Sequence, residues 1–290
     1  MHQFDRNMMR KSIFLVAAAC FSAIFVTTGC MNSNTPGQDS LESDTIIADT
    51  AIQDSLSEFI EETPMPEAAD EIFDDFFFNF AASRKVQRER IDFPLTVDNY
   101  GKEKIVEQKQ WQMEHFFMRQ GFYTLIMTNA KQRQYAKDTK LKNVTVERID
   151  MNRKFVTQWY FARVNGLWHM TSMKHLALSK HPDATFLSFY QKFATDSTFQ
   201  QQSLFDPVTF TGPDPEDDFS TMTGELMPEQ WPSFAPQMPS GVLYNIIYAE
   251  KPYPQTNTRL LYICGIANGF QMDMMFVRQG SKWLLKKMNT

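Results

Sequence analysis

Phe73-Asp74-Asp75-Phe76-Phe77-Phe78-Asn79-Phe80-Ala81 returns in altered form as Phe186-Leu187-Ser188-Phe189-Tyr190-Gln191-Lys192-Phe193-Ala194, at an offset of 113 without a gap. In both stretches the aromatic residues are spaced three, one and three apart, which places them on one face of a helix. The spacing therefore predicts two related helices. Asp183, which follows Pro182, stands where the N-cap of the second helix is expected.

Two further blocks repeat in the same order along the chain. Gln110-Trp111 matches Gln230-Trp231 at an offset of 120, and a third block repeats at 115: Phe161, Arg163, Trp168 and Met173 on Phe276, Arg278, Trp283 and Met288. Three ordered blocks with small changes of offset indicate a duplication. Each unit would hold about 105–110 residues, an ordinary size for a domain.

Within each unit the pattern predicts helices first and strands afterwards. Lys102 to Arg119 is expected to form a second helix, and its counterpart is prolonged by the proline-rich stretch 211–240, expected to be an irregular insertion with one helical turn near Glu229. Runs rich in β-branched and aromatic residues predict strands at 122–128, 144–150, 155–161, 242–248 and 270–276. Asn165-Gly166 predicts a tight hairpin before a closing strand.

The N-terminus has the pattern of an export signal. Arg6, Arg10 and Lys11 precede an apolar run over 13–26, which is too short for an ordinary membrane span. The run ends at Thr27-Thr28-Gly29-Cys30, which resembles a bacterial lipobox, with Thr27 where leucine is commoner. We expect residues 1–29 to be removed and Cys30 to carry a diacylglyceryl anchor with palmitate-type acyl chains, each a strong membrane contact. An ordinary secretory signal with an incidental Cys30 is the alternative.

Composition narrows the function classes. The chain has 290 residues, a net charge of −5 and three cysteines, so neither nucleic-acid binding nor a disulfide-rich scaffold is favoured. Residues 30–69 are acidic and predict a solvated tether. Cys264 lies in an apolar run and is expected to be a buried small side chain rather than a nucleophile. No glycine-rich phosphate loop or nucleophile-elbow pattern occurs.

Helices followed by a curved antiparallel sheet that ends in the pattern of Phe161, Arg163, Gly166 and Trp168 resemble the nuclear transport factor 2-like fold. The whole chain resembles Bacteroidetes lipoproteins of domain-of-unknown-function family 4348. The resemblance implies an α+β protein of two tandem cone-shaped domains, 70–178 and 179–290, each with helices packed on a curved antiparallel sheet. It implies no known activity.

Candidate site residues follow from that cone. A pocket is expected to be lined by aromatic, methionine and histidine side chains: Trp111, His115, Trp159, Phe161, Met272 and Met274. An interaction surface is expected at a basic stretch and in the proline-rich insertion: Lys131, Arg133, Lys137, Lys140, Trp231 and Phe234. His115 and His169 are weaker catalytic candidates. The spacing of His169, His175 and His181 gives little support for a metal, and no cofactor is expected.

These patterns predict a lipid-anchored cell-envelope protein of a Gram-negative bacterium, with its membrane partner bound through the N-terminal lipid. The absence of early acidic residues after Cys30 favours the periplasmic face of the outer membrane over surface display. The folded part is expected to be a non-catalytic binding or assembly module for a small apolar ligand, a peptide, a glycan or an envelope protein. A pocket enzyme of the isomerase or dehydratase type, or a purely structural protein, remains the alternative.

Overall fold

The computed structural model describes residues 65–214, 216–249 and 253–290, all within one compact unit of the chain. The export signal, Cys30 and most of the acidic tether lie outside the described residues, so those expectations stay predictions. Among the residues that are described, no helix is both long and apolar enough to cross a membrane.

The helices and strands form two similar series, and in each series two α-helices come first and six strands follow. The first series is α3 (Phe73–Ala82), α4 (Arg84–Arg90), β1 (Ile91–Asn99), β2 (Lys102–Val106), β3 (Phe122–Met127), β4 (Asn143–Asp150), β5 (Phe155–Val164) and β6 (Leu167–Ala177). The second is α5 (Ala184–Thr195), α6 (Ser197–Gln201), β7 (Leu204–Asp214), β8 (Asp217–Leu226), β9 (Val242–Ile247), β10 (Thr258–Gly265), β11 (Gln271–Gln279) and β12 (Lys282–Asn289). Short 3-10 helices η1 to η6 lie at Glu67–Asp70, Gln108–Gln110, Phe116–Arg119, Ala130–Lys137, Leu178–Lys180 and Trp231–Ser233.

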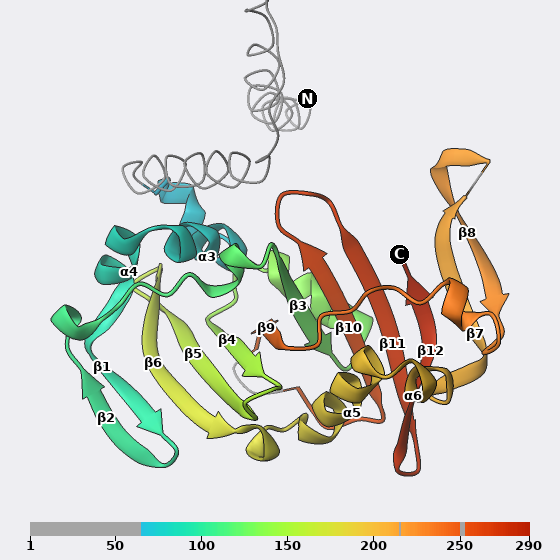
Figure 1. The fold of residues 1–290 in the computed structure, drawn as a ribbon. Helices are drawn as coiled ribbons and strands as arrows, with labels where there is room; N and C mark the ends of the chain where they lie inside the picture. The colour runs from blue at the N-terminus through green and yellow to red at the C-terminus, as the bar shows by residue number, and fades with distance from the viewer. Residues whose placement is uncertain (1–64, 215, 250–252) are drawn as a thin grey trace, which may run out of the picture. The chain divides into compact units, whose positions relative to one another are not determined.

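All twelve strands form one sheet in the order β2-β1-β6-β5-β4-β9-β3-β10-β11-β12-β7-β8, and Figure 1 shows them side by side. The two series exchange their third strands in this order. β9, from the second series, pairs antiparallel with β4 from Thr145–Ile247 to Asp150–Val242. β3, from the first series, pairs antiparallel with β10 of the second. Each group of strands is therefore completed by the other half of the chain.

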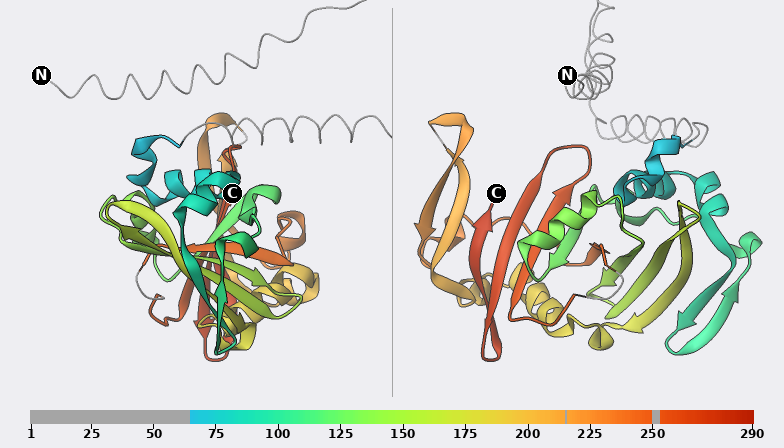
Figure 2. Two further views of the ribbon diagram at one scale, coloured as in Figure 1. Left: turned by 90° about the vertical axis from the view of Figure 1, so that its left-hand side faces the viewer. Right: turned by 180° about the vertical axis from the view of Figure 1, so that it is seen from behind.

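β3 and β9 meet at the middle of the sheet as parallel neighbours through a single register pair, Thr124–Asn245. Side chains of β3 alternate between two hydrophobic cores, Leu125 and Met127 in one and Ile126 in the other. Because successive side chains of a strand point to opposite faces, the two cores lie on opposite faces of the sheet. Figure 2 agrees, with α3 and α4 on a different side from α5 and α6.

Each core is built around one aromatic ring of the sheet. The rings that surround it come from the helix face that the aromatic spacing predicted. Phe161 on β5 is surrounded by Phe73, Phe76, Phe77 and Phe80 of α3, with ring centroids 5.3–6.1 Å away. Phe276 on β11 meets Phe186, Phe189 and Phe193 of α5 at 5.3–5.6 Å. Such edge-to-face pairs add about 0.5–1.5 kcal/mol each beyond burial. The two predicted helices are confirmed.

The predicted helix over Lys102 to Arg119 is wrong. Tyr100 and Gly101 adopt positive φ angles of 54° and 85°, and the Gly101 amide donates to Oδ1 of Asp98 at 2.6 Å. This turn folds Lys102–Val106 back as β2 against β1. The apolar residue that suggested a buried helix face, Ile105, is 44% exposed on this edge strand.

The proline-rich stretch 211–240 is also more regular than predicted. Its first part completes a hairpin of β7 and β8 that corresponds to β1 and β2, with strands of 11 and 10 residues instead of 9 and 5. After both hairpins the connection to the exchanged strand is equally long, 107–121 and 227–241. The second half is therefore longer in this region because its hairpin of β7 and β8 is longer than the hairpin of β1 and β2. The expected helical turn is the short η6, beginning at Trp231.

Smaller expectations have mixed outcomes. The predicted strands are confirmed, and Asn165 and Gly166, with φ angles of 52° and 87°, form the tight turn between β5 and β6. Asp183 occupies the N-cap position of α5 without a side-chain cap bond. Its carboxylate instead pairs with Nη2 of Arg259 at 2.5 Å. Cys264 is buried on β10 as a free thiol, as expected, and burial raises its pKa.

Candidate functional site: a polar cavity at the mouth of the first cone

A cavity of about 620 Å³ opens between the loop 113–120 and the strands β4, β5, β6 and β9. Its volume is in the range of small-molecule sites. The loop contributes Met113, Glu114, His115, Phe116, Arg119 and Gln120, and the strands contribute Arg148, Thr157, Trp159, Met173, His175, Val242 and Tyr244. Because Tyr244 and Val242 belong to the exchanged strand β9, both halves of the chain build this cavity.

Gln87 fixes the loop that forms one wall. Its amide is completely buried and makes four hydrogen bonds. Nε2 donates to the carbonyls of Phe80 at 3.0 Å and Glu114 at 2.7 Å, while Oε1 accepts from the Trp111 indole at 3.0 Å and the Glu114 amide at 3.1 Å. One side chain from α4 thus holds the loop at the position from which Glu114 and His115 reach the cavity.

The floor of the cavity is aromatic. The Phe116 ring meets Trp159 edge-on at 4.9 Å, and Tyr244 stacks on Trp159 at 6.4 Å with an interplanar angle of 15°. Phe116 has a φ of 48°, an unusual value for a bulky side chain that tends to mark functional sites. Trp159 is 2% exposed, and its buried Nε1 has no hydrogen-bond partner among the described residues. A buried donor without a partner costs stability, so this indole N–H is an unsatisfied polar group beneath the floor.

Charged groups stand on the walls. Arg148 pairs with Asp150 at 3.3 Å, with its guanidinium 5.6 Å from the Phe155 ring centroid, and Arg119 is exposed at the rim. The Glu114 carboxylate accepts from the Phe116 amide at 3.1 Å. Burial, reinforced by the charge of Glu114 and opposed by Arg148, raises the pKa of Tyr244 to about 12. Tyr244 is therefore a neutral hydroxyl near neutral pH.

His175 is held at the far side of the cavity. Its Nδ1 lies 3.0 Å from the Thr157 hydroxyl on the neighbouring strand β5. Burial, with the charge of Lys104, lowers the pKa of His175 despite Asp98. The imidazole is thus mainly neutral near pH 7, and the cationic side chains of the cavity are Arg119 and Arg148, of which Arg148 is paired with Asp150.

The corresponding hollow in the second half is uncharged. A cavity of about 470 Å³ lies by Phe122 of the exchanged strand β3, with Ile263 and Met272 at the positions that match Arg148 and Thr157. None of its described lining residues is charged. Its neighbour Pro236 corresponds to Phe116 at the offset of 120, so the left-handed turn is not repeated. Charged groups therefore line the cavity of one half only.

The six predicted pocket residues do not surround one cavity. His115 and Trp159 line the polar cavity, whereas Trp111 is turned toward Gln87 and packs on the edge of the first core. Phe161 is fully packed inside the first core. Met272 and Met274 belong to the second core on the opposite face, and Met272 also lines the uncharged cavity.

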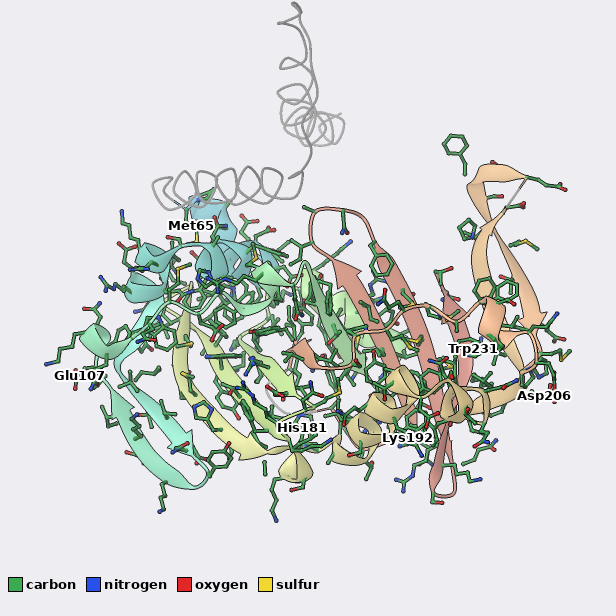
Figure 3. All side chains as sticks on the ribbon, in the orientation of Figure 1. Met65, Glu107, His181, Lys192, Asp206 and Trp231 are labelled. Atoms are coloured by element: carbon green, nitrogen blue, oxygen red, sulfur yellow. The ribbon has the colours of Figure 1, made fainter. Side chains whose placement is uncertain are left out.

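The predicted interaction surface is also divided. Lys131, Arg133 and Lys137 on η4 and the nearby Lys140 are exposed, and Arg133 lies over the Tyr262 ring at 5.2 Å. Trp231 is only 1% exposed, with its indole donating to Oε1 of Gln200 at 2.7 Å; Figure 3 shows it beside α6. It is therefore a core residue. Phe234 is 48% exposed and packs on Phe210.

The remaining histidines have separate surroundings. His169 faces outward beside the buried Trp168 and pairs with Asp92 at 2.8 Å. His181 is buried and donates from Nε2 to Glu147 at 3.0 Å. Across the described residues no group of three or more potential metal ligands comes together.

Sequence reasoning missed Glu114, Arg148 and Tyr244. Arg148 carried a signal, because Glu147-Arg148 places two adjacent charges within a predicted strand, so that one of them points to each face, and charged residues are seldom buried. Tyr244 carried none, since its strand was expected to complete the second cone rather than the first.

Two short helices packed on a curved, largely antiparallel sheet with a cavity at its mouth define an α+β protein of the nuclear transport factor 2-like class. A solved nuclear transport factor 2-like protein from Bacteroides fragilis is 34% identical, with a TM-score of 0.70 over 78% of this chain and 98% of that chain. The chain belongs to the family described as domain of unknown function 4348, whose model matches residues 52–290. That resemblance is thereby confirmed. No curated protein matches the chain in a sequence comparison.

Proposed function

We propose that this chain is a lipid-anchored cell-envelope protein whose two tandem nuclear transport factor 2-like domains form one binding module. The N-terminal signal pattern and Cys30 support the anchor, and the acidic segment after Cys30 supports a tether. The two matching series of elements, each with its own helix pair and core, support a duplicated domain. The membrane is the outer membrane of a Gram-negative bacterium, with the periplasmic face favoured.

The ligand proposed for the polar cavity is an acidic sugar, free or as part of a glycan. Arginine is suited to carboxylates because its planar donors match both oxygens, and Arg119 and Arg148 both line the cavity. Glu114, Gln120 and Thr157 supply partners for hydroxyl groups. The aromatic floor offers an apolar surface to the C–H face of a sugar ring. Among the expected ligand classes this favours a glycan, whereas a small apolar ligand fits the uncharged cavity of the second half better than the polar cavity.

The observation that carries the proposal is that two arginines, Arg119 and Arg148, line one cavity together with the aromatic side chains of Trp159 and Tyr244. An isothermal calorimetric titration tests the proposal, with glucuronate added to the full-length protein in detergent. Glucuronate should bind at least about tenfold more tightly than glucose, since the carboxylate bonds to arginine are charge-assisted. Arg148→Gln should abolish this preference, and Arg153→Gln, outside the cavity lining, should leave it unchanged. Equal binding of the two sugars would contradict the proposal.

Membrane attachment is tested separately. Cys30→Ala should move the protein from the membrane fraction to the soluble fraction, because the acyl chains supply most of the membrane affinity. A processed Cys30→Ala variant that stays on the membrane would contradict lipid anchoring without affecting the ligand proposal.

A catalytic alternative rests on one observation. Tyr244, a neutral hydroxyl, and the carboxyl group of Glu114 lie in the same cavity, and a proton donor beside a carboxylate is what an isomerase or dehydratase requires. If the cavity catalyses such a reaction on an acidic sugar, Tyr244→Phe should lower turnover by about 100-fold while binding is retained. If Tyr244→Phe converts the sugar as fast as the native protein, or if the native protein does not convert it at all, the catalytic alternative is wrong and the binding function stands.

A further inference from the structure

A second cavity, of about 610 Å³, lies on the other face of the first half's strands. Tyr160 and Lys174 line it, whereas their chain neighbours Trp159 and Met173 line the polar cavity. Because adjacent residues of a strand point to opposite faces, the two cavities open on opposite faces of the sheet, and they share one lining residue, His175 near the end of β6. Apolar groups form much of the second cavity's wall: Leu176, Ala177, Pro182 and Ile247.

Behind this wall lies a buried carboxylate. Glu147 is 0% exposed and accepts hydrogen bonds from Gln158 at 2.6 Å, Asn245 at 3.0 Å and His181 at 3.0 Å. Burial would raise its pKa, but the His181 imidazole and the amide donors outweigh burial and lower it. Glu147 is therefore an ionised acceptor. His181, labelled in Figure 3, lies just after η5, where the chain passes from the first half to the second.

The ionised carboxylate fixes the direction of the next hydrogen bonds. Since Glu147 can only accept, the Gln158 amide must turn its NH2 group toward it, which leaves Oε1 facing Tyr160. The Tyr160 hydroxyl therefore donates to Gln158, at 2.7 Å. Its proton is used inward, so toward the cavity the Tyr160 oxygen can only accept.

The charge at the rim is positive. Lys174 is neutralised by Asp98 at 2.9 Å. Lys180, on η5, is exposed and forms no ion pair with any residue that the structure describes. The cavity thus combines an apolar wall, a fixed acceptor at Tyr160 and an available ammonium group at Lys180.

The second half does without these groups. At the offset of 115, Gln158 corresponds to Asp273, Tyr160 to Met275 and Glu147 to Tyr262. The related strands β10 and β11 nevertheless form the same antiparallel pair as β4 and β5. Strand pairing therefore does not require this relay of polar groups.

From this arrangement we infer that the second cavity is a separate ligand site, for a small amphipathic carboxylate that also carries an N–H donor. Lys180 binds the carboxylate, the Tyr160 oxygen accepts from the N–H, and the apolar group contacts Leu176, Pro182 and Ile247. An N-acylated apolar amino acid has all three parts. The site lies across the sheet from the polar cavity and does not depend on what that cavity binds.

Saturation-transfer NMR on the full-length protein in detergent, with N-acetyl-L-phenylalanine as the probe and a detergent blank, tests this inference. A dissociation constant of about 1 mM or tighter is expected for so small a molecule. N-acetyl-L-phenylalaninamide, which lacks the carboxylate, should bind at least about fivefold more weakly, because the ammonium contact is charge-assisted.

Two variants assign the binding to this cavity. Tyr160→Phe removes the acceptor and keeps the ring, and Lys180→Gln removes the charge from an exposed position where folding is not at risk. Each should weaken the probe about fivefold, the effect of one lost hydrogen bond or ion contact. Tyr135→Phe and Lys137→Gln, at exposed positions on η4, are matched controls that should have no effect.

Three outcomes would overturn the inference. The first is no binding of the probe to the native protein at about ten times the expected dissociation constant. The second is equal binding of the acid and the amide. The third is loss of binding in Arg148→Gln with full binding in Lys180→Gln, which would place the probe in the polar cavity. The first two results would not bear on the glucuronate titration, whereas the third would show that Arg148 in the polar cavity binds a carboxylate.

Discussion

Asn245 donates a hydrogen bond from Nδ2 to Oε2 of Glu147 at 3.0 Å, although the two residues are 98 positions apart. Its Oδ1 accepts from the backbone amide of Ile126 at 2.8 Å. β3 and β9 share only one register pair, so the Asn245 side chain makes a hydrogen bond to the β3 backbone that a strand partner would make in a regular ladder. One asparagine thus joins β4, β9 and β3 at the place where the halves exchange strands.

Asn245→Leu should therefore destabilise the protein strongly. The change leaves the ionised, buried Glu147 with one donor fewer and the Ile126 amide without its acceptor. We expect a loss of about 3 kcal/mol in the free energy of unfolding, measured by urea denaturation. Asn257→Ala, in an exposed loop, is the control and should change stability by less than about 0.5 kcal/mol. A loss in Asn245→Leu as small as the control's would mean that the backbone pairs alone hold the exchange.

The exchanged strands also predict how the chain behaves when it is cut. A protease site inserted in the link between β6 and α5, after Lys180, allows the folded protein to be cleaved between its halves. Because each core contains a strand from the other half, the fragments should stay together on size-exclusion chromatography and separate only in denaturant. Fragments that separate in native buffer would contradict the pairing of β9 with β4.

Asp74 should make stability depend on pH. Burial, opposed by the Tyr248 hydroxyl that donates to Asp74 at 2.8 Å and reinforced by Asp75, raises its pKa from 3.8 to about 6. The folded state therefore holds this proton more tightly than the unfolded chain does. The resulting stability is fully present below about pH 4 and is lost as the pH rises through about 6, a change of about 3 kcal/mol.

Asp74→Asn should remove that part of the pH dependence, because the amide stays neutral and can still accept from Tyr248. Urea midpoints at intervals between pH 4 and 8 measure it. Glu89→Gln, at an exposed position of α4, is the control and should retain the native slope. If Asp74→Asn keeps the slope as well, another group is responsible.

A matched pair of glutamines distinguishes stability from ligand binding. Gln87 and Gln200 are related by the repeat, and each accepts from the indole of a tryptophan, Trp111 or Trp231. Gln87→Leu and Gln200→Leu should each cost about 2 kcal/mol through unsatisfied buried groups. Only Gln87→Leu should loosen the loop 107–121 and weaken binding in the polar cavity, since only Gln87 holds Glu114.

Hydrogen exchange followed by mass spectrometry measures the loosening. Faster exchange is expected over residues 107–121 in Gln87→Leu and over 227–241 in Gln200→Leu. Equal weakening of ligand binding by the two variants would show that it follows global stability rather than the position of the loop.

The repeat allowed much of the fold to be predicted from sequence. The aromatic spacing predicted α3 and α5, and the third matching block predicted the strands around Phe161 and Phe276. The hairpin of β1 and β2 was missed because Tyr100-Gly101 is a weak turn signal. Ile105 also fits the apolar face of a helix, which favoured the wrong prediction. The strand exchange could not be predicted, because β3 and β9 are similar enough in pattern that local sequence does not decide which half each joins.

The exchange of β3 and β9 also limited the prediction of the site. A cavity within one unit was expected, so candidates were chosen in matching places in both halves, and Met272 and Met274 proved to belong to the other core. The polar cavity instead takes Tyr244 from β9, which only the sheet order brings to Arg148 and Glu114. Residues contributed by an exchanged strand are not marked by any local motif.

The crossing of β3 and β9 has a consequence for how such a gene can change. Two identical chains that exchanged this strand would necessarily carry the same residues in both cavities. With both series of elements in one chain the two cavities can differ, and here one is charged while the other is not. Recombination, however, cannot move either half to a new gene by itself, because the half would leave behind a strand of its own core.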